Sequence, residues 1–249
     1  MRSLSKILLA AMLITGVGHA YANSRRNVAI NAGDGNNVVQ DRHLSGFNAI
    51  DAAGSFDVYI TQGSNESVKV DAPAEVQDRV ITEVSGGTLR IHNKNGSWGS
   101  WGDAWGHKKI IVYVVIDQVN AVGITGSGDV YFRDGIRSSN LKLWVSGSGD
   151  VYGKVDAKSL ECNISGSGDM KLSGHAENSS VSVSGSGDFT ARELETSNTS
   201  VHVSGSGDAS ISVSNNLEAS VSGSGDVSYR GNPKHVSKSK SGSGDISGD

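Results

Sequence analysis

The four-residue word Gly-Ser-Gly-Asp occurs seven times in this 249-residue chain, and it constrains the fold more than any other feature. Each copy follows a Ser or a Thr, and successive copies begin 21, 19, 19, 20, 18 and 19 residues apart. The copies begin at Gly126, Gly147, Gly166, Gly185, Gly205, Gly223 and Gly242. A period of this length indicates a repeat architecture, in which each unit is completed by its neighbours.

Apolar residues keep one parity on both sides of the word. Leu143 and Val145 stand four and two residues before Gly147, and Val151 stands four residues after it. Alternation with period two is typical of β-strands that turn one set of side chains inward. So short a unit cannot bury its own apolar face, so the copies are expected to stack. The sequence therefore predicts an all-β fold, a parallel β-helix or solenoid with rungs of about 19 residues.

Within the word, the two glycines share the inward parity, where a larger side chain would crowd the interior. The Asp side chains take the outward parity, so stacking would align them as a ladder up one face. Stacked carboxylates repel, and either hydrogen bonds from nearby backbone N–H groups or bound calcium could offset that repulsion. We favour a structural ladder, with calcium binding as the alternative. The ladder consists of Asp129, Asp150, Asp169, Asp188, Asp208, Asp226 and Asp245.

Two further features of the repeats concern stability. The only cysteine, Cys162, excludes an internal disulfide, and its inward position predicts a small core residue rather than a nucleophile. The last copy carries Lys238 and Lys240 at inward positions, which predicts a charged cap on the final rung. The histidines are scattered without the spacing of metal ligands, so no cofactor is expected.

The N-terminus has the features of a secretory signal peptide. Arg2 and Lys6 precede a short apolar stretch, and Ala20-Tyr21-Ala22 has the pattern of a cleavage site, so residues 1–22 are predicted to be removed. No later segment is long and apolar enough to span a membrane as a helix. The net charge of −4 gives no support for nucleic-acid binding.

The rest of the chain is predicted to form one domain. Residues 23–43 are polar and expected to be loosely ordered, and residues 44–249 are expected to form a single solenoid. Within it, residues 44–120 contain less regular strands and residues 121–249 contain the regular rungs.

The order of segments in the first half carries a family resemblance. The segments are GFNAIDAAGSFDVYITQG, SVKVDAP, GGTLRIHN and KKIIVYVVI, followed by the repeated SGSGDV. This series resembles the head GIN domain family, bacterial secreted proteins known as putative auto-transporter adhesins, over residues 44 to 249. The resemblance implies a right-handed β-helix-like fold and an adhesive role, and it brings no catalytic residues.

A loop at residues 94–107, KNGSWGSWGDAWGH, is the best local candidate for a ligand-contacting site. It carries Trp98, Trp101 and Trp105 among glycines, which makes packing within a strand improbable. Exposed Trp rings stack on sugars or fill protein pockets. The alternative, that the loop folds back over a flank or an end of the solenoid, has about equal weight.

These features predict a secreted, non-catalytic, adhesin-like binding protein of the periplasm or cell surface. Its partner would be a glycan, an envelope component or a surface protein. A structural or assembly role in the cell envelope is the first alternative. A carbohydrate-active enzyme is a weaker one, because the ladder carboxylates are alike and none is singled out for acid–base chemistry.

Overall fold

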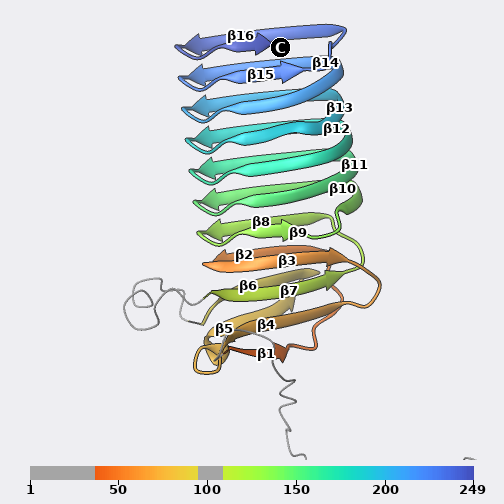
Figure 1. Cartoon of the computed structure of the whole chain (residues 1–249), viewed down its shortest axis with the longest axis vertical. Coiled ribbons are helices and arrows are strands. Elements are labelled where there is room, and N and C mark those ends of the chain that lie inside the picture. Colours follow the sequence, from red (N-terminus) through yellow and green to blue (C-terminus); the bar gives the residue numbers. More distant parts are fainter. Residues whose placement is uncertain (1–36, 95–108) are drawn as a thin grey trace, which may run out of the picture.

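The computed structural model describes residues 37–94 and 109–249, which form one tall stack of strands (Figure 1). The first half contains β1 (Asn37–Asp41), β2 (Ala49–Gly54), β3 (Phe56–Gln62), β4 (Ser67–Pro73), the short 3-10 helix η1 (Gln77–Arg79), β5 (Val80–Ser85), β6 (Thr88–Asn93) and β7 (Ile110–Ile116). The second half contains β8 (Ala121–Gly126), β9 (Val130–Phe132), β10 (Ile136–Gly147), β11 (Val151–Gly166), β12 (Met170–Gly185), β13 (Phe189–Gly205), β14 (Ala209–Gly223), β15 (Val227–Arg230), β16 (His235–Gly242) and β17 (Ile246–Gly248).

The repeats stack in parallel and in register, which confirms the predicted solenoid. Gly147 of β10 pairs with Gly126 of β8 below it and with Gly166 of β11 above it. The same column continues through the first glycine of every later word: Gly185, Gly205, Gly223 and Gly242.

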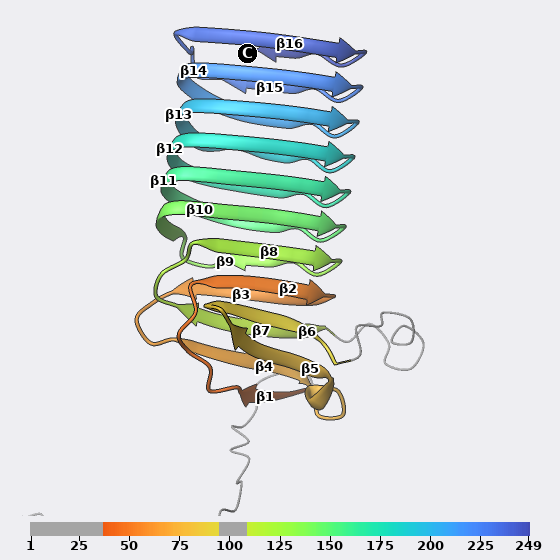
Figure 2. The same cartoon turned by 180° about the vertical axis from the view of Figure 1, so that it is seen from behind.

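Each rung is a flattened turn with two faces and two ends. In β11, residues 159–166 pair along one face, which we call face A, and residues 151–152 pair along the other, face B. The Gly-Ser-Gly-Asp words connect face A to face B at one end, the word end. Residues such as 154–158 return the chain from face B to face A at the opposite end, the bend end. Figures 1 and 2 show the tight turns of the word end and the broad curves of the bend end on opposite sides of the stack.

The inward parity forms one continuous core. Val145 and Val151, on either side of a word, are at most 1% exposed, and Cys162 is fully buried. Four residues before the word, the core column contains Val122, Leu143, Cys162, Val181, Val201 and Ala219. Burial raises the pKa of the Cys162 thiol, because the thiolate would be desolvated. The prediction of a small, unreactive core residue at this position agrees with this burial.

The reason for the glycines differs from the one expected. A Cβ built on Gly149 would overlap the carbonyl oxygen of Gly128, and one on Gly147 would overlap that of Gly126. The main obstacle is therefore the backbone of the rung below. The apolar interior adds to it at later words, since a Cβ on Gly168 would also lie 2.8 Å from Cγ1 of Val145. Gly147 also has φ of +126°, a conformation that L side chains rarely adopt. In each rung, the backbone of the Gly-Ser-Gly-Asp turn therefore packs directly on the backbone of the same turn in the rung below.

The first half extends the same coil downward and then closes it. β2 and β3 form a complete rung, in which Gly54 pairs with Gly126 and Val58 pairs with Val130. β6 and β7 continue faces A and B below that rung. β4 then pairs antiparallel with β7, and β5 pairs antiparallel with β6. The segment 23–43, expected to be loosely ordered, contains β1, because its residues 37–41 pair antiparallel with β4.

The last rung carries the charged cap that the sequence predicted. Lys238 and Lys240 pair with Ala219 and Val221, so they occupy the inward column of the final rung. Their ammonium groups donate to the carbonyls of Ile246 (2.9 Å) and Gly244 (3.2 Å) across the coil. Charges at inward positions of an edge strand oppose strand addition by another chain.

Candidate functional site

The aspartate ladder is built into the backbone hydrogen bonding of the word end. The Oδ1 atom of Asp150 accepts the amide N–H of Asp169 at 2.8 Å, and Asp169 accepts that of Asp188 at 2.8 Å. The same bond repeats along the whole ladder from Asp129 to Asp245, at 2.7–3.1 Å. Each carboxylate therefore satisfies the backbone of the next rung, which supports the structural interpretation of the ladder.

The ladder presents no ready metal centre. Among the described residues, no group of three or more His, Cys, Asp or Glu side chains is arranged to hold a metal ion. Because one oxygen of each carboxylate below Asp245 accepts a backbone N–H group, a cation there would have to bind through the other oxygen or displace that bond.

A stack of tyrosines beside the ladder was not anticipated from the sequence. Tyr113, Tyr59, Tyr131 and Tyr152 come from β7, β3, β9 and β11, and they point outward from face B. Neighbouring rings lie 5.7, 4.8 and 5.4 Å apart between centroids and are nearly parallel. All four side chains are partly exposed, so they form an aromatic strip across four rungs.

Hydrogen bonds tie the tyrosine stack to the aspartate ladder. The Tyr131 hydroxyl donates to Oδ2 of Asp129 at 3.0 Å, and the Tyr152 hydroxyl donates to Oδ2 of Asp150 at 2.7 Å. The bond to the Asp150 carboxylate, together with burial, raises the pKa of Tyr152 to about 12. Burial and the bond to Asp129 likewise raise the pKa of Tyr131. The hydroxyls of Tyr131 and Tyr152 are therefore held in place by the ladder and stay protonated at neutral pH.

A signal for this stack was present in the sequence. Tyr59, Tyr131 and Tyr152 each stand five residues after the first glycine of a word, in GSFDVY, GSGDVY and GSGDVY. That position has the outward parity. In the rungs above, it holds Lys171, Thr190 and smaller polar residues, so the strip ends at β11.

The tryptophans Trp98, Trp101 and Trp105 lie outside the described residues, so their placement remains a prediction. The described chain on either side shows where their segment is attached. β6 ends at Asn93 and β7 begins at Ile110, which pairs with Phe56 at the word end. Lys109 forms an ion pair with Asp57 at 3.1 Å, one residue before the inward Val58 and two before Tyr59. The attachment point is therefore beside the tyrosine stack.

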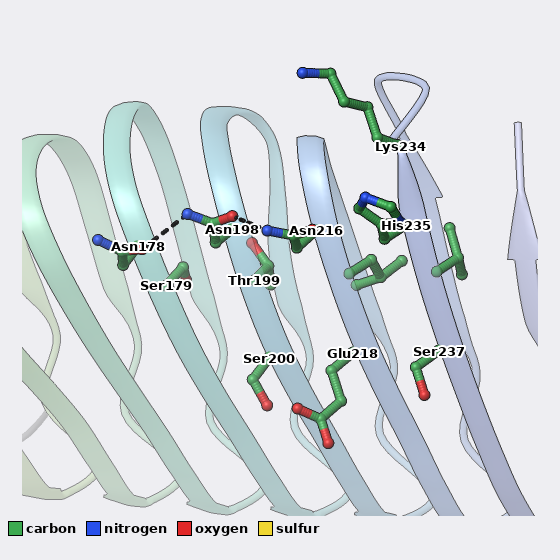
Figure 3. A pocket seen from close by; sticks show the side chains of 12 residues that line it. Asn178, Ser179, Asn198, Thr199, Ser200, Asn216, Glu218, Lys234, His235 and Ser237 are labelled. Carbon is green, nitrogen blue, oxygen red and sulfur yellow. Dashed lines mark hydrogen bonds between the residues drawn. The ribbon is translucent and has the colours of Figure 1, made fainter.

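A shallow groove at the bend end follows a ladder of asparagines (Figure 3). Asn198 donates to Asn178 at 3.0 Å, and Asn216 donates to Asn198 at 2.6 Å. Ser200, Glu218 and Ser237 project from neighbouring strands beside this ladder, and Lys234 and His235 stand at its upper end. The amides bind mainly to one another, which is a stabilising arrangement in stacked strands.

The comparisons with known proteins identify the family. A family model described as "Putative auto-transporter adhesin, head GIN domain" matches residues 46–233. This match covers more than half of the chain, so the chain belongs to that family, as the resemblance of its first-half segments implied. No curated protein matches the chain.

Solved structures share the fold. A putative adhesin from Bacteroides fragilis has a TM-score of 0.79 at 24% identity, with 86% of this chain and 97% of that chain covered. A putative adhesin from Parabacteroides distasonis has a TM-score of 0.70 at 25% identity, with 87% and 98% covered. A putative lipid binding protein from the same species has a TM-score of 0.69 at 24% identity, with the same coverage. In the described ranges, no helix is long and apolar enough to cross a membrane.

Proposed function

We propose that this protein is a secreted, non-catalytic, adhesin-like binding protein of the bacterial envelope or surface. The tyrosine stack is the observation that carries the proposal, because four aromatic side chains gather on the outside of an otherwise small and polar sheet face. Family membership and the adhesin-named structural neighbours support the same class of function. The ligand would be a glycan, an envelope component or a surface protein.

The proposed contact surface combines the tyrosine stack with Trp98, Trp101 and Trp105. Tyr and Trp provide large contact areas at low conformational cost, and both are enriched where proteins bind partners. The ion pair of Lys109 with Asp57 supports this combination, since it attaches the tryptophan-bearing segment next to Tyr59. The rigid rungs beneath would hold the aromatic groups in fixed positions.

A catalytic role is disfavoured by the uniformity of the ladder. Its carboxylates below Asp245 accept the same backbone hydrogen bond in rung after rung. Asp129 and Asp150 differ only by also accepting a tyrosine hydroxyl, which occupies their second oxygen and leaves it less free for acid–base work. The only thiol is fully buried.

The test is binding of the mature protein, without residues 1–22, to a panel of immobilised glycans, to isolated bacterial envelopes and to host-cell surface proteins. A triple Trp98→Ala, Trp101→Ala, Trp105→Ala variant and a Tyr59→Ser, Tyr131→Ser variant should each weaken binding. The matched control is Thr190→Ala with Ser210→Ala, which alters the same outward column in higher rungs. Binding that survives both aromatic variants would rule out this contact surface.

Secretion is tested separately. The first residue of the protein recovered from the periplasm and from the cell surface should be Asn23, as cleavage after Ala22 requires. Protein that keeps residues 1–22 in the cytoplasm would contradict the proposed location. Self-association without any ligand would favour the alternative of an assembly protein of the envelope.

A further inference from the structure

A second hollow at the bend end has properties that the word end lacks. One part, of about 580 Å³, extends from Gln62 to Glu195. An adjoining part, of about 270 Å³, shares His175 and Glu195 with it and continues to Gly231. Together they form one trough along the stack axis, which we call the bend trough. Its size lies in the range of small-molecule binding sites.

The trough lies where the repeat is interrupted. In β13, Ala191 pairs with Ile211 of β14, but the next paired residue is Glu195, opposite Ser212. Residues 192–194 therefore have no counterpart in β14, and a second shift follows between Thr196 and Asn198. Bulges of this kind re-aim side chains and are common beside binding sites. The words, in contrast, keep their register through every rung.

Three glycines line the trough at positions whose backbone conformation disfavours larger residues. Gly135, Gly174 and Gly231 have positive φ angles of +84°, +110° and +106°. A Cβ on Gly174 would overlap the carbonyl oxygen of Val155, so this position is closed to larger residues.

One wall of the trough is a column of charged and titratable side chains from four successive rungs. Arg137 pairs in register with Asp156, Asp156 with His175, and His175 with Glu195. Gln62 anchors the lower end, because its side chain accepts the Arg137 amide N–H at 2.8 Å and donates to the Arg137 carbonyl at 3.0 Å.

The hydrogen-bonding capacity of this column is almost unused. The contact from Arg137 Nε to Asp156 Oδ2 is 3.7 Å, and the two side chains are 87% and 59% exposed. Such a pair contributes little to stability. Within the described part of the chain, the side chains of His175 and Glu195 make no hydrogen bond or ion pair with another protein group. The ladder aspartates below Asp245, by comparison, each accept a backbone N–H group.

The charge balance restricts the class of ligand. Arg137 and Lys154 provide two cations, and Asp134, Asp156 and Glu195 provide three carboxylates around them. A polyanion would face the carboxylates, a polycation would face the two basic groups, and an apolar chain would leave the charged wall without partners. Neighbouring hydroxyl groups of a sugar, in contrast, can donate to carboxylates and accept from a guanidinium or an imidazole.

We propose that the bend trough binds a neutral oligosaccharide laid along the stack axis, with Arg137, Asp156, His175 and Glu195 as its hydrogen-bonding column. Rungs spaced about 4.8 Å apart would present one such group to each successive sugar residue. This inference rests on the proposed binding function, and it assigns a ligand class to a surface separate from the aromatic one.

The experiment is calorimetric titration of the mature protein with four neutral hexasaccharides: maltohexaose, cellohexaose, mannohexaose and hexa-N-acetylchitohexaose. Hexagalacturonate and hexalysine are the charged comparisons. We expect saturable binding of at least one neutral hexasaccharide. An Asp156→Asn, Glu195→Gln variant should bind it about tenfold more weakly or worse, because it loses charged acceptors for sugar hydroxyls. Glu218→Gln, the same chemical change beside the asparagine ladder, should leave the affinity unchanged.

Several outcomes would overturn the proposal: no neutral hexasaccharide binds, a charged hexamer binds more tightly, or the trough variant binds as well as the wild type. Unchanged melting temperatures of the variants separate lost binding from lost folding. If the triple tryptophan variant loses the sugar while the trough variant retains it, the trough assignment fails and the proposed function stands. If the trough variant alone loses it, the trough is the glycan site and the aromatic surface needs another ligand.

Discussion

The word end and the bend end close the same rungs in different ways. At the word end, Gly-Ser-Gly-Asp turns repeat in register, and the backbone of each turn packs on the one below. The carboxylates there take part in the fold, since every ladder carboxylate below the last accepts an amide N–H from the next rung. At the bend end, register shifts occur in β13, and the side chains that project there differ from rung to rung.

This contrast separates groups that hold the fold from groups that are free to bind. A turn whose carboxylates are tied to the backbone of the next rung has less to offer a ligand, however often it is repeated. Side chains such as His175 and Glu195 add little to the stack and retain their donors and acceptors. In this protein, regularity therefore indicates structure, and departures from it indicate candidate binding sites.

The largest loss of stability is expected for Gly168→Ala at the word end. The new Cβ would overlap the Gly149 carbonyl oxygen and lie 2.8 Å from Cγ1 of Val145. We expect the free energy of unfolding to fall by about 4 kcal/mol or more, measured by urea denaturation. Gly135→Ala at the bend end is the control, since its nearest neighbour is 3.4 Å away, and a cost of about 1–2 kcal/mol is expected from its positive φ. Equal costs would contradict the backbone-packing argument.

The next largest effect is expected for Asp188→Ala. The amide N–H of Asp208 loses its acceptor, so the free energy of unfolding should fall by about 1–3 kcal/mol. Asp188→Asn retains an acceptor oxygen and should cost less in the same denaturation experiment. If the Asp188→Ala and Asp188→Asn variants had the same free energy of unfolding, the hydrogen bond along the ladder would not contribute to stability.

The tyrosine stack provides a spectroscopic test of the hydrogen bond between the Tyr152 hydroxyl and the Asp150 carboxylate. The pKa of Tyr152 is raised to about 12 by its bond to Asp150 and by burial, against an ordinary value of 10.0. A raised pKa in the folded state means that this contribution to stability is complete below pH 10 and declines as the pH rises toward 12. Absorbance titration of an Asp150→Ala variant should show one tyrosine ionising closer to its ordinary pKa. An unchanged titration would mean that the bond does not exist in solution.

A much smaller effect on stability is expected at the bend end. Glu195→Gln and His175→Ala should each change the free energy of unfolding by no more than about 0.5 kcal/mol, because both side chains are free of partners in the described chain. Thermal and urea denaturation of both variants would measure this. A cost comparable to that of Asp188→Ala would erase the distinction between the two ends.

The smallest effect is expected from calcium. Since one oxygen of each ladder aspartate accepts a backbone N–H group, millimolar calcium should leave the melting temperature where EGTA or magnesium leaves it. A rise specific to calcium would show that the ladder is a metal site and not only a turn device.

Much of the architecture was predictable because each repeat shows, within a few neighbouring residues, which side chains alternate inward and outward. The parity of Leu143, Val145 and Val151 predicted which side chains are buried, and Lys238 and Lys240 predicted the charged cap. The strand β1 was missed because its residues carry no clear alternation, and it forms only by pairing with β4. The tyrosine stack was missed because it requires knowing that positions in four separate segments lie side by side.

The period, the parity of the core and the stacking of the rungs could all be predicted from the amino-acid sequence, because these follow from side chains that alternate within one strand. The family could be predicted as well, since the ordered segments of the first half are specific. The tertiary structure was needed to show why the word requires glycine and which groups the aspartates bind. It was also needed to locate the tyrosine stack and the bend trough. Those properties depend on distances between rungs about 19 residues apart in the chain, and such distances exist only once the backbone of one rung rests on the next.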